Sequence, residues 1–259
     1  MTELHPLLLV VAGHDPSGAG IDADRDAAQE LPFEFAGVVT ANTEQDAGGV
    51  RAIGARPARK WLLEAFAFVL GDVRAVKFGL LPGAEHVLAA LDLVRALRER
   101  HGADFPVVVD PVLAASSGGR FLDADAVKTL KRELLPARVV LTPNLDELAE
   151  LTARDPRELA RALEPRLAAA RDLCALGAAA VIAKGGHGGE DPVRDLVVRA
   201  DGRYQWLLHP RVKGGKIRGS GCRYSTRLAA RLGQGWTLET AAEEAARHVA
   251  TRIAAGGTR

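Results

Sequence analysis

The sequence predicts an α/β fold in which helices cover both faces of a mostly parallel central sheet. Short apolar runs of strand length alternate with longer segments of helical periodicity along most of the chain. The apolar runs are continuous rather than alternately polar, which is typical of parallel strands buried on both faces. The length of 259 residues fits one large domain or two small ones, and no linker or repeat divides the chain. We therefore interpret residues 1–259 as a single domain.

Each predicted strand is a short run of mainly Leu, Val, Phe and Ala, and each predicted helix repeats apolar residues every three or four positions. The predicted strands are Leu7–Val11, Phe35–Thr40, Ala75–Leu80, Pro106–Val112, Val139–Thr142 and Ala179–Ala183. The predicted helices are Ile21–Leu31, Arg59–Leu70, Ala84–Arg100, Ala124–Leu134 and Glu158–Leu176.

The last part of the chain departs from this alternation. A hairpin is predicted over residues 195–212, because Asp201-Gly202 is a turn signal inside this segment. Two helices are predicted after it, over Gly221–Leu232 and Leu238–Ala254, and Thr237 is the expected N-terminal cap of the second.

Composition and charge exclude several classes of partner. The formal net charge is +1 and no block of like charges stands out, so neither nucleic acid nor a membrane is an expected partner. The chain shows no signal peptide and no apolar run of membrane-spanning length. The two cysteines, Cys174 and Cys222, imply no disulfide framework, and no Cys/His grouping has zinc spacing. The expected location is the cytoplasm.

Polar and glycine-rich segments follow nearly every predicted strand. In open parallel sheets, ligands bind beyond the carboxyl ends of the strands, so these segments predict a common active-site face. They are Gly13–Gly20, Thr40–Gln45, Lys77–Leu81, Asp110–Val112, Thr142–Glu147 and Lys184–His187.

A tetrapeptide of small residues, Gly219-Ser220-Gly221-Cys222, leads into a predicted helix. Backbone N–H groups at a helix start have no intrahelical partner, and the positive end of the helix dipole lies there, so this segment is a candidate phosphate site. A thiolate is favoured at the same place, which makes Cys222 a candidate base or nucleophile. An ordinary glycine-rich turn into a helix explains the tetrapeptide equally well.

Six motifs, taken in order, resemble the ribokinase superfamily, and within it the hydroxymethylpyrimidine/phosphomethylpyrimidine kinases of thiamine biosynthesis. The opening at Ala12–Asp24 resembles the family pattern AGSDPSGGAGIQAD, and Gly219–Cys222 resembles its GTGC-type anion hole. The other four are TAxTxQ at Thr40–Gln45, DPV at Asp110–Val112, TPNxxE at Thr142–Glu147 and KGGH at Lys184–His187. The resemblance runs from about Leu7 to Ile253. It implies a ribokinase-like three-layer α/β/α sandwich and a homodimer.

The resemblance implies a kinase that uses ATP and Mg²⁺ to phosphorylate the hydroxymethyl group of 4-amino-5-hydroxymethyl-2-methylpyrimidine, and then the resulting monophosphate. By this resemblance the backbone N–H groups of Gly219–Cys222 bind the transferring phosphoryl group, and Cys222 occupies the catalytic-base position. Asp110 and Glu147 would act on Mg²⁺ through water. Asp110 also fits a turn residue before Pro111, and Glu147 fits a first-turn helix carboxylate.

The ATP-binding residues implied in the same way are Asn144, Lys184, Arg218 and Arg223. Asn144 also fits the N-cap of a helix. Arg218 ends a Lys216-Ile217-Arg218 segment where the family commonly has Asn-Thr-His, and Arg223 replaces a usual Thr or Ser. Both cations would hold phosphate, or else they are solvated surface charges.

The substrate-binding residues implied by the resemblance are Gly13, Asp24, Gln45, Leu80 and Val112. Asp24 and Gln45 match the positions that hydrogen-bond the polar edge of the aminopyrimidine. Gly13 would allow the ring to approach the backbone closely. Leu80, where the family often has Met, and Val112 would form apolar walls.

Two other functions are compatible with these residues. A pyridoxal-type kinase shares the anion hole and its cysteine. A non-catalytic pyrimidine-binding regulator would explain the replaced residues around the anion hole. A dinucleotide-binding oxidoreductase does not fit, because Gly18-Ala19-Gly20 lacks the GxGxxG spacing.

Overall fold

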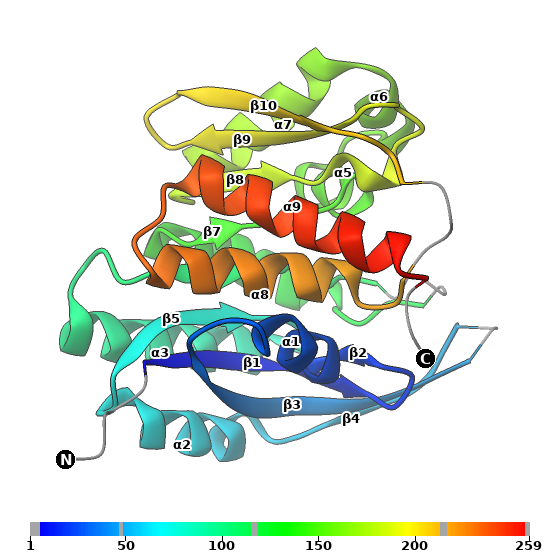
Figure 1. The fold of residues 1–259 in the computed structure, drawn as a ribbon. Helices are drawn as coiled ribbons and strands as arrows, with labels where there is room; N and C mark the ends of the chain where they lie inside the picture. Colours follow the sequence, from blue (N-terminus) through cyan, green and yellow to red (C-terminus); the bar gives the residue numbers. More distant parts are fainter. Residues whose placement is uncertain (1–5, 47–48, 115–118, 213–216, 257–259) are drawn as a thin grey trace.

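The computed structural model describes residues 6–46, 49–114, 119–212 and 217–256 (Figure 1). Within them the strands form a ten-stranded sheet in the order β10-β9-β8-β7-β6-β5-β1-β3-β4, with β2 paired to β1 off this path. The strands are β1 (Leu7–Asp15), β2 (Ala19–Gly20), β3 (Glu34–Asp46), β4 (Gly49–Ala55), β5 (Val73–Phe78), β6 (Val107–Val109), β7 (Val140–Leu141), β8 (Ala180–Ala183), β9 (Val193–Arg199) and β10 (Tyr204–His209).

The α-helices alternate with these strands and then close the chain. They are α1 (Ile21–Ala28), α2 (Ala58–Val69), α3 (Ala84–His101), α4 (Ala124–Thr129), α5 (Leu145–Thr152), α6 (Pro156–Arg161), α7 (Leu163–Ala175), α8 (Ser220–Gly233) and α9 (Leu238–Ala254). Short helices of other types are η1 (Leu130–Leu134), η2 (Leu135–Ala137) and η3 (Gly185–His187). None of the helices in the described residues combines the length and hydropathy needed to span a bilayer.

The middle of the sheet is parallel and its edges are antiparallel. Strands β3, β1, β5, β6, β7 and β8 run parallel to their neighbours in this block. The hairpin β9–β10 and strand β4 add antiparallel strands at the two edges. The predicted, mostly parallel sheet is therefore confirmed, and the carboxyl ends of its parallel strands share one edge.

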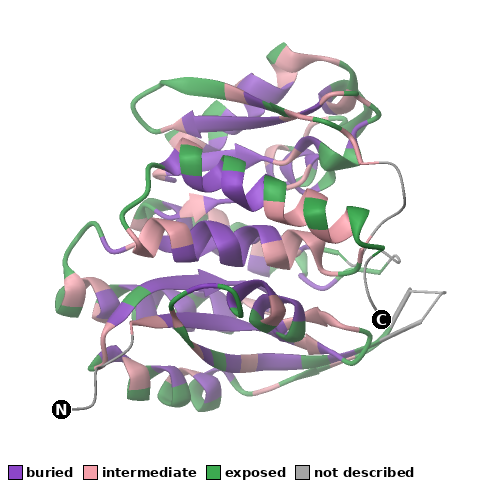
Figure 2. Cartoon of the chain, in the orientation of Figure 1, coloured by how far each residue is buried: buried purple, intermediate pink, exposed green. Residues whose placement is uncertain are grey.

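Helices cover both faces of the sheet, as Figure 1 shows. Leu8 and Val10 of β1 belong to a core with residues of α1, α8 and α9. Leu9 and Val11 belong to a second core with residues of α2, α3, α5 and α7. Successive side chains of a strand point to opposite faces, so β1 is apolar throughout because both of its faces are covered. Figure 2 shows the resulting buried layer, and the predicted three-layer sandwich is confirmed.

The structure differs from the predicted elements in several places, and helix α5 is one that the prediction lacks. The single helix predicted over Glu158–Leu176 is two helices, because Ala162 takes an extended conformation between α6 and α7. Pro165 has no N–H group for a bond to the preceding turn, so the second helix has to start again just before it. Strand β4 has no counterpart in the prediction, since Gly49–Ala55 carries too few apolar residues for a buried run and pairs with β3 at the sheet edge.

Candidate active site

The first turn of α8 forms the candidate phosphate site. Gly219 precedes this helix with φ 70° and ψ 21°, in the left-handed region. A Cβ atom at this position would lie 2.6 Å from Cβ of Ala23, so glycine is required on both counts. No described side chain caps α8, and the N–H groups of its first turn therefore keep no intrahelical partner. These groups and the positive end of the helix dipole point to the same edge of the sheet.

Asp110 and Lys184 lie directly beside this turn. They follow β6 and β8, and Lys184 Nζ donates to Asp110 Oδ1 at 2.8 Å. Thr142, which follows β7, donates to the same oxygen at 3.3 Å. A Cβ atom at Gly221 would lie 3.2 Å from Lys184 Nζ and 3.4 Å from Asp110 Oδ2, so the helix approaches this pair as closely as a glycine allows. The structure thus brings together three of the predicted site positions.

Lys184 is a largely buried cation. Burial alone would lower the pKa of its ammonium group, but the carboxylates of Asp110 and Glu147 raise the pKa above its usual value. Its Nζ also lies 6.0 Å from the ring centroid of Tyr224. Lys184 therefore stays charged at neutral pH, next to helix N–H groups that also attract anions.

Glu147 and Asn144 form a capping box at the start of α5. Asn144 Oδ1 accepts a hydrogen bond from the Glu147 N–H at 2.9 Å, and Glu147 Oε2 accepts one from the Asn144 N–H at 2.7 Å. Burial raises the pKa of Glu147 to about 8; Lys184 opposes this rise and Asp110 adds to it. The side chain of Asn144 is thus occupied by the cap, while Glu147 remains electrostatically linked to Asp110 and Lys184.

Glu147→Gln is expected to change how stability depends on pH. Because the folded protein holds the Glu147 proton more tightly than the unfolded chain does, wild-type stability falls as pH rises from about 4.3 to about 8. Glutamine cannot ionise and can still complete the capping box. The free energy of unfolding of the variant, relative to that of wild type, should therefore be higher at about pH 8.5 than at about pH 5, by on the order of 1–3 kcal/mol. Urea unfolding without Mg²⁺ at both pH values measures this, and an equal difference at both would contradict it.

Cys222 is the third residue of α8 and lies against the first loop. The backbone N–H of Gly20 hydrogen-bonds to its sulfur, and burial raises the pKa of its thiol to about 12, although nearby Lys77 opposes the rise. The expectation that the helix N-terminus leaves a thiolate at this position is therefore wrong. Burial is the largest influence on this thiol and exceeds the opposing effect of Lys77. Cys222 and Cys174 are both free cysteines.

Asp24 lies in a fully buried ion pair. Its Oδ1 and Oδ2 accept hydrogen bonds from Lys77 Nζ at 2.8 and 2.9 Å, and Thr226 Oγ1 donates to Oδ1 at 2.7 Å. Neither Asp24 nor Lys77 exposes any side-chain surface. The resemblance implies that Asp24 hydrogen-bonds the polar edge of the aminopyrimidine. The structure instead buries this carboxylate away from any surface that a substrate could reach.

The sequence placed Lys77 in a polar segment of the active-site face but did not indicate its ion pair with Asp24, and it gave no signal for Thr226. Lys77 stands within the otherwise buried strand β5, and a charge in such a run needs a partner. That signal was present, but the sequence does not identify the partner. The pair lies beneath the first turn of α8, since Lys77 is among the charges that act on Cys222. Both residues position the site without being exposed to it.

Two of the predicted substrate-binding residues pack against each other. A Cβ atom at Gly13 would lie 2.8 Å from Leu80 Cδ2. Thr40 Oγ1 donates to the Leu80 carbonyl at 2.6 Å and fixes the backbone there. Val112 is half-buried beyond β6, and its N–H donates to the Asp110 carbonyl at 2.8 Å. Gln45 belongs to β3, but its side chain lies outside the described part of the chain.

The two predicted phosphate-binding arginines differ in their contacts. Arg223 donates to Asp26 Oδ2 through Nε at 3.1 Å and Nη2 at 3.0 Å, and through Nη1 to the Arg218 carbonyl at 2.8 Å. Its guanidinium group therefore ties α8 to α1, while Nη1 lies close to Gly219, 3.2 Å from where a Cβ atom of that residue would be. Arg218 is partly exposed, with Nη2 3.7 Å from Asp15 Oδ2 in the first loop. Lys216 lies outside the described residues.

Arg223→Ala is expected to affect stability more than nucleotide binding. Loss of its bonds to Asp26 and to the Arg218 carbonyl should cost about 1 kcal/mol, because Arg252 still pairs with Asp26. The KM for ATP should change by less than about threefold. Urea unfolding and steady-state kinetics measure both quantities. A tenfold or larger rise in KM, about 1.4 kcal/mol of binding, would instead assign Arg223 to the phosphate.

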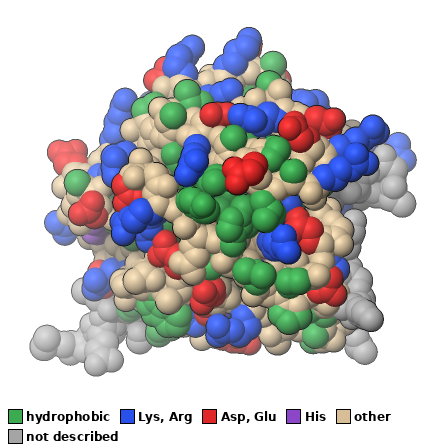
Figure 3. Space-filling view, turned by 90° about the horizontal axis from the view of Figure 1, so that it is seen from above, with side chains coloured by type: hydrophobic (Ala, Val, Ile, Leu, Met, Phe, Trp, Pro, Cys, Tyr) green, Lys and Arg blue, Asp and Glu red, His purple; other side chains and the backbone are tan. Residues whose placement is uncertain are grey.

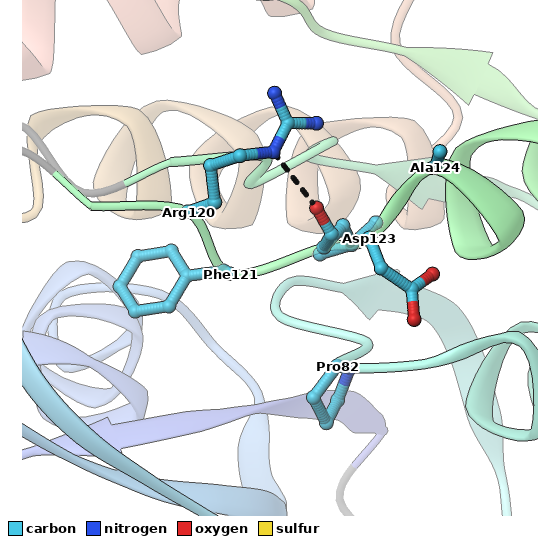
Figure 4. Close-up of a pocket in the computed structure, with 6 residues that line it drawn as sticks. Pro82, Arg120, Phe121, Asp123 and Ala124 are labelled. Carbon is cyan, nitrogen blue, oxygen red and sulfur yellow. Dashed lines mark hydrogen bonds between the residues drawn. The ribbon is translucent and has the colours of Figure 1, made fainter.

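A pocket of about 460 Å³ lies beside this edge of the sheet, between Pro82 after β5 and residues 120–124 before α4. Figure 4 shows Pro82 on one side and Arg120, Phe121 and Asp123 on the other. Arg120 Nε donates to the Leu122 carbonyl at 3.3 Å. None of the predicted site residues lines this pocket, so it adjoins the candidate site without containing its charged groups.

Comparison with known proteins agrees with this geometry. The family model described as phosphomethylpyrimidine kinase matches residues 15–258. The hydroxymethylpyrimidine/phosphomethylpyrimidine kinase of Streptomyces coelicolor is 35% identical over 257 residues, covering 97% of this chain and 90% of that protein. The solved structure of a phosphomethylpyrimidine kinase from Clostridium difficile has a TM-score of 0.76 and 25% identity, covering 96% of this chain and 99% of its own.

A pyridoxal kinase from Staphylococcus aureus, solved with AMP-PCP and pyridoxal, is also similar. Its TM-score is 0.82 at 25% identity, covering 97% of this chain and 88% of its own. This likeness fits the alternative of a pyridoxal-type kinase without favouring it, and it confirms the ribokinase-like fold. The matches cover nearly the whole chain, and the structure brings Asp110, Lys184 and Gly221 together at one edge of the sheet. The chain therefore belongs to the hydroxymethylpyrimidine/phosphomethylpyrimidine kinase family.

Proposed function

We propose that this chain uses ATP to phosphorylate the hydroxymethyl group of 4-amino-5-hydroxymethyl-2-methylpyrimidine, and then the monophosphate so formed, in thiamine biosynthesis. The observation that carries the proposal is the approach of the α8 first turn to Lys184 and Asp110, with Gly221 as the point of contact. Phosphoryl transfer requires positioning and charge neutralisation more than covalent chemistry. Unpaired helix N–H groups beside a permanently charged ammonium group supply both.

The proposed mechanism divides the work among these residues. The N–H groups of Ser220, Gly221 and Cys222 bind the equatorial oxygens of the transferring group, and the Lys184 ammonium offsets their charge. Gly13 and Leu80 form part of the wall for the ring, and the ionised fraction of Cys222 accepts the hydroxyl proton. Arg218, near Asp15 at the edge of the first loop, is proposed to bind the phosphate tail of ATP.

Asp110 and Glu147 fit a Mg²⁺ ion that is shared with the nucleotide. No group of three or more potential metal ligands occurs among the described residues. Mg²⁺ in phosphoryl-transfer sites commonly uses one or two carboxylates together with substrate phosphates and water, so two acids suffice. Bound there, Mg²⁺ would neutralise phosphate charge; the pKa of Glu147 is raised mainly by burial, and the nearby Asp110 carboxylate adds to the rise.

The first test is ADP release by purified protein with Mg·ATP, using hydroxymethylpyrimidine, its monophosphate and pyridoxal in separate reactions. Turnover of both pyrimidines supports the proposal, and Lys184→Ala should abolish it if no contaminating kinase is present. Turnover of pyridoxal alone would assign the protein to the rival kinase. Binding of hydroxymethylpyrimidine in calorimetry without ADP release would identify a regulator on a kinase fold.

We also propose that the chain acts as a cytoplasmic homodimer with one kinase domain per subunit. Strand β10 ends the sheet among the described residues, and Tyr204 and Leu208 on it are 49% and 60% exposed. Figure 3 shows hydrophobic side chains gathered on the face at this end of the molecule. An apolar edge strand is suited to pair with a second copy.

Leu208→Glu is expected to shift such a dimer toward monomer, because it places two like charges at a two-fold interface. Light scattering after size-exclusion chromatography measures the mass directly. Leu70→Glu is a matched control, since Leu70 is also exposed but lies after α2, far from β10 in the sheet order. A wild-type monomer, or a dimer that both variants retain, would contradict the use of this edge.

A further inference from the structure

A second pocket, of about 430 Å³, lies at the opposite edge of the sheet from the candidate active site. The starts of β6, β7 and β8 line it through Val107, Val140 and Ala180, and the α8–α9 connection lines it through Leu232 and Trp236. The strands are parallel, so this is their amino edge, away from Asp110 and Lys184. The volume is in the range of small-molecule sites.

Arginines dominate the charge of this pocket. Arg98, Arg138 and Arg199 line it, against a single acid, Asp104. Arg199 is neutralised, since it donates to both carboxylate oxygens of Glu239 at 2.8 Å. Arg98 donates only to the backbone carbonyls of residues 137 and 138, and its Nε is buried without a partner among the described residues. The charge of Arg98 therefore has no paired carboxylate.

Of the three arginines, Arg138 has the guanidinium group that is most accessible to a ligand. It is exposed, and its side chain makes no hydrogen bond or ion pair with any residue that the structure describes. Its backbone takes the left-handed conformation, with φ 53° and ψ 49°, which is uncommon for arginine. Burial and then the neighbouring Arg138 charge lower the pKa of Arg98, and the single acid Asp104 offsets this only in part. An anion between them would relieve this repulsion.

The remaining walls are apolar and aromatic. Phe105 and Val107 are buried at 6% and 2% exposure and form one side of the pocket. Trp236 is still 42% exposed, although the Arg231 guanidinium lies 4.6 Å from its ring centroid. A partly exposed tryptophan in the same pocket as Arg98 and Arg138 suits a flat ring that carries a negative group.

We propose that this pocket binds the phosphate monoester of a flat aromatic ring, with Arg138 and Arg98 on the phosphate and Trp236 against the ring. The site is separate from the proposed catalytic site and does not depend on it. Helix α8 joins the two, since it begins at the anion site and ends at Gly233 beside the pocket. A Cβ atom at Gly233 would lie 3.1 Å from the Arg74 carbonyl oxygen, so this end of α8 is held firmly against β5.

Calorimetric titration of the full chain with phenyl phosphate, phenol and inorganic phosphate tests the proposal. Phenyl phosphate should bind with a Kd of about 0.1–1 mM, at least about tenfold more tightly than either fragment. Arg138→Asn should weaken it about tenfold, because it removes the charge-assisted bonds. Asparagine tolerates the left-handed backbone, so this variant should fold normally.

Two controls locate the binding. Arg132→Asn removes another exposed arginine, whose one ion pair among the described residues is with the adjacent Glu133, and should leave the affinity unchanged. Lys184→Ala removes the cation of the candidate active site and should also leave it unchanged. The proposal is overturned if phenyl phosphate shows no saturable binding up to about 10 mM, if Arg138→Asn binds like wild type, or if Lys184→Ala abolishes the binding.

Discussion

Asp24→Ala is expected to lower the free energy of unfolding by about 3–5 kcal/mol, because it leaves the Lys77 ammonium group buried without a counter-ion. Lys77 exposes no side-chain surface, and its hydrogen bonds to both oxygens of Asp24 are its charged contacts in the described structure. Burial alone would lower the pKa of Lys77, and Asp24 raises it above its usual value. Equilibrium urea unfolding of wild type and variant measures the loss.

Three variants separate this structural role from substrate binding. Asp22→Ala, on the same turn of α1, removes an exposed carboxylate that lies 3.3 Å from His14 Nε2, and should cost less than about 1 kcal/mol. The double variant Asp24→Leu with Lys77→Met removes both charges and should recover most of the loss. Asp24→Asn should also destabilise, since an amide does not neutralise Lys77. A change in KM for the pyrimidine at unchanged stability would contradict the buried ion pair and favour a substrate contact.

Cys222→Ala is expected to reduce kcat/KM by about 10²–10⁴-fold, the usual contribution of a positioned acid–base group. Since burial raises the pKa of the thiol to about 12, only a small fraction is ionised near neutral pH. The deprotonated thiol is the active form, and its fraction increases with pH. Wild-type kcat/KM should therefore rise about tenfold per pH unit from about pH 6 to 9. The alanine variant should lose this slope. Stopped-time ADP assays across the pH range measure both.

Cys174→Ala is the matched control. It removes the other free cysteine, half-buried on α7, and should retain both the rate and the pH slope. A wild-type rate that levels off near pH 7 would show that Cys222 does not titrate as the base. Full activity in Cys222→Ala would restrict this residue to lining the pocket.

Much of the site geometry could be predicted because it follows from the topology of a parallel sheet. Asp110, Thr142 and Lys184 each come directly after a strand, and the carboxyl ends of neighbouring parallel strands meet at one edge. Gly221 joins them because a helix start of small residues can approach a charged pair closely. Most strand and helix positions were predicted for the same reason, since continuous apolar runs and helical periodicity are local properties; β4 and α5 were not predicted.

The roles of Asp24 and Arg223 could not be predicted, because they depend on how helices pack across the sheet. Lys77 is 53 residues from Asp24, and Asp26 is 197 residues from Arg223. Nothing in either local sequence identifies such a partner. The prediction of a thiolate at Cys222 was wrong for a related reason. The helix start can be recognised in the sequence, whereas the burial that raises the pKa of the thiol depends on how the first loop packs over α8.

The carboxylate of Asp26 on α1 has a consequence for how the helices on this face are held together. It accepts hydrogen bonds from Arg223 of α8 and Arg252 of α9. Arg227 of α8 adds bonds to the Ala27 carbonyl and to Glu244 of α9. The three helices on this face are therefore cross-linked to each other by charge as well as resting on the sheet. This cross-linking fixes the register between the first loop, which leads into α1, and the anion hole at the start of α8.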